Sequence, residues 1–96
     1  MSPIKGKITL EDGAEYEGDL INGIPYGKGK QTYVDGSVYV GDFVNGKFHG
    51  KGKLTYYYGG EYDGEWANGE QNGQGRMVYN DGTIEDGNFI NSMFAK

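Results

Sequence analysis

The chain has 96 residues and a formal net charge of −5, and a chain of this length forms one domain that buries only a modest share of its surface. Nineteen glycines and nine tyrosines against two prolines indicate short strands joined by tight turns, and an aromatic content of 15% argues against disorder. The absence of cysteine excludes disulfides and thiolate metal sites.

A 23-residue repeat runs through the chain from near its start. In chain order we predict a partial repeat over 5–15, full repeats over 16–38, 39–61 and 62–84, and a capping partial repeat over 85–96. Together they form a single domain, 1–96, of four tandem hairpins. Glycine and asparagine recur in fixed columns, among them Gly6, Gly29, Gly52 and Gly75; Gly18, Gly41, Gly64 and Gly87; and Asn22, Asn45, Asn68 and Asn91.

Strands and turns follow from the pattern inside each repeat. Alternation of period two, as in residues 38–43, predicts strands, and no stretch has a helical stripe. An Asp-Gly pair such as Asp35-Gly36 is a strong hairpin signal. A two-residue loop would pair Tyr33 with Val38, whereas a three-residue loop ending in a left-handed Gly36 would pair Lys28 with Asp42.

Charge favours the three-residue loop. In that register each hairpin brings opposite charges together, and neutral Gln74 faces neutral Asn88. Cross-strand pairs contribute roughly 0.2 to 1 kcal/mol each. We therefore predict a type I turn with a G1 bulge and the pairs Lys5–Asp19, Lys7–Glu17, Lys28–Asp42, Lys51–Glu65, Lys53–Asp63 and Arg76–Asp86.

The same register separates two faces of the sheet. One carries a solvated ladder of lysines and acids, and the other carries the core, with Gln31, Leu54 and Met77 beside the aromatic residues. Glycines paired across a hairpin leave slots in which an aromatic ring from the neighbouring repeat can lie. The glycines with this structural role are Gly18, Gly29, Gly41, Gly52, Gly64 and Gly75.

The strings YVGDFVNGKFHGKG and YDGEWANGEQNGQG resemble the MORN (membrane occupation and recognition nexus) repeat. The resemblance covers nearly the whole chain. It implies an all-β fold of about four tandem antiparallel β-hairpins in one elongated, twisted, single-layer sheet, and a role in scaffolding, dimerisation or partner contact. Leu20, Glu85 and Ser92 depart from the pattern, and the last two predict the capping repeat.

We predict no catalytic residue, cofactor site or metal site, and hence no enzyme. Most carboxylates face a basic residue, and His49 is the only histidine. The Asp-Gly turns lack the alternating ligands of a calcium loop, and the GKGK segments open a strand where a phosphate-binding loop opens a helix.

Aromatic residues are the candidates for partner binding, and two interpretations stay open for those that recur at the repeat spacing. They form the core, or part of their stripe lines a groove that takes a partner segment. Tyr57 and Tyr58 stand at a turn, where we expect an exposed patch near residues 24–26 or 48–49 of the connecting loops. The candidate contact residues are Tyr16, Tyr39, Tyr62, Trp66, Tyr57, Tyr58, Phe48, Tyr26 and Phe94.

The segment 88–96 is too apolar for a free end, because it contains Phe89, Ile90, Met93 and Phe94. It either folds back over the last hairpin or docks onto a second copy of the chain.

These features predict a non-enzymatic protein-interaction or scaffolding module that associates with itself or serves as an accessory subunit of a larger assembly. The alternative is a peripheral module recruited by membrane phospholipid. We expect a protein partner, with a homodimer as one form of it, and no nucleic acid; the acidic charge disfavours lipid. No apolar run is long enough for a signal peptide or a membrane span, so we expect a cytoplasmic protein.

Overall fold

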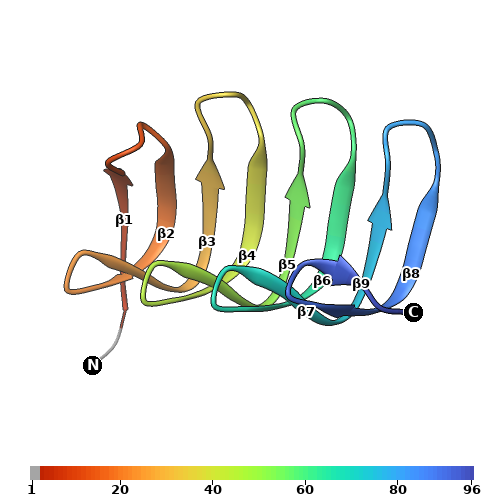
Figure 1. Cartoon of the computed structure of the whole chain (residues 1–96). Coiled ribbons are helices and arrows are strands. Elements are labelled where there is room, and N and C mark those ends of the chain that lie inside the picture. Colours follow the sequence, from red (N-terminus) through yellow and green to blue (C-terminus); the bar gives the residue numbers. More distant parts are fainter. Residues whose placement is uncertain (1–2) are drawn as a thin grey trace.

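The computed structural model describes residues 3–96, which form nine strands and no helix. Each strand is antiparallel to its neighbours in the sequence, in one open sheet, so the predicted tandem antiparallel hairpins are confirmed (Figure 1). The strands are β1 (Ile4–Thr9), β2 (Glu15–Ile21), β3 (Ile24–Thr32), β4 (Val38–Val44), β5 (Lys47–Thr55), β6 (Glu61–Ala67), β7 (Glu70–Val78), β8 (Ile84–Ile90) and β9 (Met93–Phe94).

Three-residue turns join β1 to β2, β3 to β4, β5 to β6 and β7 to β8, and they have the predicted type. The Gly36 N–H donates to the Tyr33 carbonyl at 3.0 Å, and the Tyr33 N–H donates to the Ser37 carbonyl at 2.8 Å. Gly36 has a φ of 99°, which a residue with a Cβ rarely adopts. The register places Lys28 opposite Asp42, as the charge pattern predicts.

Residues 24–26 and 48–49, which we predict to lie in loops that connect the hairpins, lie in strands, so that prediction is wrong. Asn45 and Gly46 have φ values of 51° and 79°, the combination that a two-residue type I′ turn requires. This turn joins β4 directly to β5, so Phe48 and His49 lie within β5, as residues 24–26 lie within β3. The four hairpins therefore merge into one continuous sheet.

One glycine from each of the first eight strands lies in a row that crosses the sheet. The row is Gly6, Gly18, Gly29, Gly41, Gly52, Gly64, Gly75 and Gly87, each paired with the next. Beyond the row the register shifts, so that Asp42 faces residues 49–51 of β5. Extra residues of this kind bend a strand. Figure 1 shows the three-residue turns along the top of the sheet and the Asn-Gly turns along the bottom.

Buried aromatic rings form the core. Tyr39 lies at its centre, stacked on Phe48 and edge-on to Phe43 and Trp66 at centroid distances of 5.1 and 5.5 Å. Edge-on contacts of this kind add to the stabilisation that burial supplies. The buried cluster consists of Tyr16, Tyr39, Phe43, Phe48, Tyr62, Trp66 and Phe89, with Leu54 and Met77 packed against it.

In each of the three full repeats, the glycine slot is filled by a tyrosine of the same repeat. A Cβ at Gly52 would overlap the Tyr39 ring, and Gly29 and Gly75 stand in the same relation to Tyr16 and Tyr62. The prediction that the ring comes from the neighbouring repeat is wrong, because the tyrosine extends along the sheet from its own strand to the glycine of the next strand.

We expect Gly52→Ala to lower the free energy of unfolding by about 3 kcal/mol, because the new methyl group would overpack the Tyr39 ring. Gly69→Ala is the matched control. Its φ of 84° makes alanine strained, at about 1 kcal/mol, but a Cβ there meets no atom within 4 Å. Urea unfolding of both variants is the measurement, and equal losses would refute the role of the slot.

Candidate functional site

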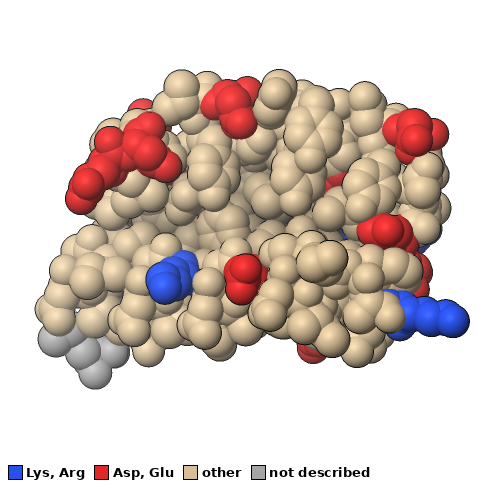
Figure 2. All heavy atoms as spheres, in the orientation of Figure 1, with Lys and Arg blue, Asp and Glu red and all other residues tan. Residues whose placement is uncertain are grey.

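A groove lies between the two rows of turns. Figure 2 shows this face hollowed along its middle, with few charged side chains upon it. Two adjoining hollows of about 200 and 190 Å³ share the Tyr33 side chain as a wall. One is also lined by Asp35, Ser37, Leu54 and Tyr56, and the other by Gln31, Gly46, Lys47, Phe48 and Gly69.

Tyr33 and Tyr56 supply the aromatic wall of the groove. Each is the last residue before a three-residue turn, and each N–H donates across its turn at 2.8 Å, which fixes the backbone that carries the ring. Both rings are half-buried, and burial raises the pKa of both phenols. Tyr33 also lies edge-on to Phe48 at a centroid distance of 6.5 Å.

Neither Tyr33 nor Tyr56 was among the predicted contact residues. The signal that could have found them is the recurrence of tyrosine at the 23-residue spacing, continued by Tyr79. Alternation alone places these residues on the same face as the core, and it does not tell a buried ring from one that stands at the edge of a groove.

Gln71 lies beside the groove with part of its amide unsatisfied. The side chain is 4% exposed, and its Nε2 donates to the Tyr56 hydroxyl at 3.3 Å. The amide oxygen Oε1 is buried and has no hydrogen-bond partner among residues 3–96. A buried acceptor without a donor costs about 1 to 3 kcal/mol. A phenylalanine, Phe48, occupies the equivalent position one repeat earlier.

The recurring aromatic candidates belong to the core. Tyr16, Tyr39 and Tyr62 are 0% exposed, and Trp66 and Phe48 are buried with them. Their polar ends are also occupied: the Tyr39 hydroxyl donates to the Asp42 carbonyl at 2.8 Å, and Trp66 Nε1 donates to the Gly52 carbonyl at 3.0 Å. A partner could reach the three tyrosine rings and Trp66 only by opening the core, whereas Phe48 also lines one hollow of the groove.

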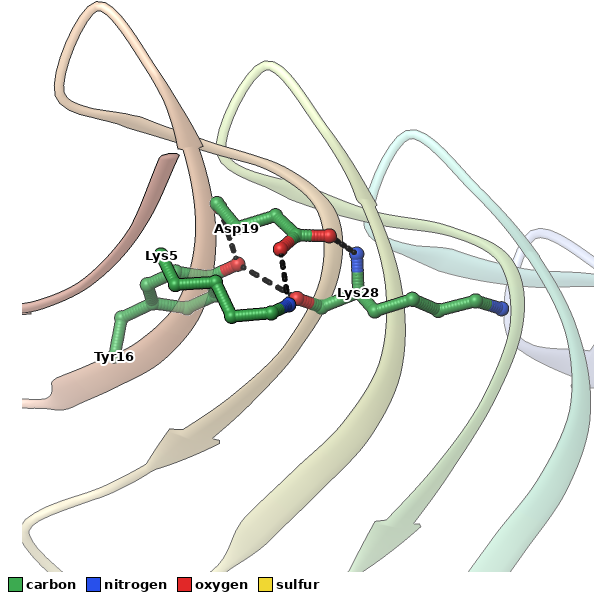
Figure 3. Close-up of polar contacts among 4 residues, drawn as sticks. All are labelled: Lys5, Tyr16, Asp19 and Lys28. Atoms are coloured by element: carbon green, nitrogen blue, oxygen red, sulfur yellow. Dashed lines mark hydrogen bonds and ion pairs between the residues drawn. The ribbon is translucent and has the colours of Figure 1, made fainter. Parts of the chain in front are cut away.

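Carboxylates at the bend have a structural role. Figure 3 shows Asp19 held by Lys5 Nζ at 2.6 Å and by the Lys28 backbone N–H at 3.0 Å, while the Tyr16 hydroxyl donates to the Asp19 carbonyl. The bond from Lys5, followed by that from the Lys28 backbone, lowers the pKa of Asp19. Asp42 and Glu65 accept the same backbone bond in the following repeats, so each of these acids satisfies the strand where the sheet bends.

Tyr57 and Tyr58 are exposed, as predicted, at 65% and 51%. Tyr58 stacks on Tyr56 at a centroid distance of 5.1 Å, and this contact continues the apolar surface from the groove onto the row of three-residue turns. Val34, in the preceding turn of this row, is also exposed. We call Val34, Tyr57 and Tyr58 the tyrosine rim.

The predicted patch of Tyr57 and Tyr58 with residues 24–26 or 48–49 does not form. The tyrosine rim follows the three-residue turns, whereas residues 24–26 and 48–49 follow the Asn-Gly turns along the opposite side of the groove (Figure 1). Tyr26 is partly exposed on that opposite side. The prediction failed because it placed residues 24–26 and 48–49 in connecting loops near the Asp-Gly turns, whereas they lie in strands next to the Asn-Gly turns at the other end.

Phe94 covers the last ring of the core. The segment after β8 turns back at Asn91 and Ser92, so β9 pairs with β8 and Phe94 lies 5.3 Å from buried Phe89 between ring centroids. The predicted fold-back over the last hairpin is confirmed, and Phe94 keeps part of its surface exposed.

His49 is half-buried in β5, and within residues 3–96 no three His, Asp or Glu side chains gather where they could hold a metal ion. The same residues contain no helix of the length and apolarity that crossing a bilayer demands.

Comparison with known families agrees with the repeats in the structure. The profile described as MORN repeat matches three consecutive stretches, residues 16–38, 39–60 and 62–84. The chain belongs to the MORN repeat family. MORN repeats are non-catalytic modules that generally mediate interactions with proteins or membranes. A search of curated proteins finds no match.

We expect the stability of this MORN repeat chain to fall as the pH rises from 10 towards 12. Burial, followed by the charge of Asp19, raises the pKa of Tyr16 from 10.0 to about 12, and burial also raises the pKa of Tyr39 and Tyr62. Above pH 10 the unfolded chain loses these protons and the folded chain keeps them, so unfolding is favoured.

Urea unfolding at pH 8, 10 and 11 measures this loss. Tyr16→Phe lacks one of the ionisable groups and should show a shallower decline than the wild type. A free energy of unfolding that stays constant over this pH range would contradict the burial of the three phenols.

Proposed function

We propose that this MORN repeat chain is a non-catalytic module that binds a segment of another protein in the groove. The observation that carries the proposal is the arrangement of Tyr33, Leu54 and Tyr56, which leave apolar surface half-exposed around an open hollow while the core beneath them is closed. Tyrosine is enriched at the residues that contribute most to protein interfaces, because a large rigid ring carries a polar tip.

The groove and its borders favour an amphipathic segment. Its apolar side chains would contact the tyrosine wall, and the neighbouring tyrosine rim would extend the contact area. Asp35 lies on one side of the groove and Lys47 on the other, so the polar face of the segment can meet either charge. The net charge of −5 favours a neutral or basic segment over an acidic one.

Binding without catalysis agrees with the chemistry of the remaining polar groups. Asp19, Asp42 and Glu65 are engaged by backbone N–H groups at the bend, which removes them as free acid or base pairs. The groove itself contributes one carboxylate, Asp35, and its Oδ1 accepts a bond from the Ser37 N–H at 2.8 Å. Such a module would act as a scaffold or accessory subunit of a larger assembly.

Recruitment to phospholipid is the alternative, and its support is the exposed tyrosine rim. The basic residues argue against it. Lys5, Lys28 and Lys53 form ion pairs with Asp19, Asp42 and Glu61, which offset part of the positive charge of the lysine ladder, and the net charge of −5 disfavours an anionic surface.

Panning a peptide library against the folded chain tests the groove. We expect selected peptides to bind the wild type and to lose about tenfold in affinity with Tyr33→Ser or Tyr56→Ser, since truncation of an interface tyrosine costs more than 1 kcal/mol. Val40→Ser is the control. Val40 is an exposed apolar residue that pairs with Lys30 on the lysine-ladder face, which is the other face of the sheet from the one that carries Tyr39. Circular dichroism verifies that each variant folds.

Two outcomes would contradict the proposal. One is a set of selected peptides whose affinity falls with Val40→Ser and stays unchanged with the two groove variants. The other is co-sedimentation with phosphatidylserine vesicles that fades with added salt, in the absence of any peptide that binds, which would favour the membrane alternative.

A further inference from the structure

The outer edge of β1 exposes backbone N–H and C=O groups of specific residues. The Leu10 N–H donates to the Ala14 carbonyl at 2.8 Å, so these residues form a hydrogen-bonded pair next to the turn. Because bonded and non-bonded pairs alternate along an antiparallel ladder, Lys5, Lys7 and Thr9 turn their N–H and C=O groups away from β2. Within residues 3–96 no strand pairs with that edge.

The outer edge of β8 is half-covered. The Tyr79 N–H donates to the Thr83 carbonyl, and the same alternation turns Ile84, Asp86 and Asn88 away from β7. Asn88 is bonded on that side by Ala95 N–H at 2.7 Å. Ile84 and Asp86 have no backbone partner there among the described residues.

The internal repeat shows what would fill the open half of this edge. Residues 93–96 follow β8 as residues 24–27 follow β2, since Ile90 pairs with Met93 as Ile21 pairs with Ile24. The remaining part of β3, residues 28–32, has its counterpart one repeat earlier in residues 5–9 of β1. Segments 93–96 and 5–9 together therefore reproduce one nine-residue strand.

We propose that copies of this chain associate head to tail, with β1 of one copy added to the open half of β8 of the next. The register is that of β2 and β3, where Glu17 pairs with Lys30 and Gly18 with Gly29. In the joint, Asp86 would face Lys7 and Gly87 would face Gly6, so the glycine row would continue from one copy into the next. Pro3 and Ile4 of the added copy would take the places of Ala95 and Lys96, so one of these two segments must move aside.

Charge complementarity favours this joint over symmetric ones. Antiparallel pairing of β1 with a second β1 centred on Lys7 brings lysines together, and pairing of β8 with β8 centred on Asp86 brings aspartates together. Like charges that face each other across a ladder are destabilising. The β1–β8 contact is heterologous and does not close on itself, so it generates chains of increasing length in place of a discrete dimer.

The joint is small and consists mainly of backbone bonds and one charge pair. Glu85 stands where the other repeats have a tyrosine, so no ring extends over Gly6 of the next copy. We therefore expect weak association that depends on protein concentration and that weakens with salt.

Sedimentation velocity over concentrations up to about 1 mM tests the proposal, because contacts of this size are weak. The wild type should exceed its monomer mass of 10.5 kDa, and its average mass should keep rising with concentration. Lys7→Glu and Asp86→Lys should each weaken self-association about tenfold, because each places like charges in the joint. An equal mixture of the two variants should regain association, since every joint between unlike variants again pairs opposite charges.

Rescue on mixing separates the joint from a folding defect, because a misfolded variant would not regain association. Val40→Glu, which adds a charge away from both edges, is the control and should behave as the wild type. A mass of 10.5 kDa at all concentrations, a plateau at the dimer mass, or a mixture that associates no better than its components would each overturn the proposal.

Discussion

The contact between a tyrosine ring and the glycine of the next strand is the constraint on which the rest of the structure depends. Tyr16, Tyr39 and Tyr62 each extend along the sheet and cover a glycine, and a side chain larger than hydrogen at that glycine would overlap the ring. The hydroxyl of each tyrosine reaches the backbone carbonyl at the bend, at 2.6 to 2.9 Å. One side chain therefore fills the slot, contributes to the core and satisfies the irregular backbone beside it.

The bend beside the glycine row explains why one open sheet has a groove. Where Asp42 faces three residues of β5, the strand turns, and the acid caps the Lys51 N–H at 3.0 Å. This places the three-residue turns and the Asn-Gly turns on two sides of one hollow. The rings that cover the glycines are buried in the core and offer no surface to a partner. The aromatic surface that a partner can reach belongs to a second set of tyrosines, Tyr33 and Tyr56, at the ends of the strands.

Much of this fold can be predicted from the sequence, because the same turn and charge signals recur in each repeat. Opposite charges at Lys28 and Asp42, and their counterparts, are sufficient to fix the register of four hairpins. The sequence also contains a second hairpin signal at Asn45-Gly46, which joins β4 to β5 where we predict a connecting loop. The bend was not predictable from alternation, because the extra residues opposite Asp42 break the period on which alternation depends. Without the bend, a buried Trp66 and a groove-lining Tyr56 look alike in the sequence.

The most direct measurement of the central claim is a proton NMR spectrum of the folded chain with its glycine resonances assigned. A glycine beneath an aromatic ring has its α-protons shifted upfield by the ring current. The structure predicts such shifts for Gly29, Gly52 and Gly75, with nuclear Overhauser contacts to the rings of Tyr16, Tyr39 and Tyr62 respectively, and none for Gly69. Unshifted α-protons at the three glycines, or contacts to the tyrosine of a neighbouring repeat, would contradict it.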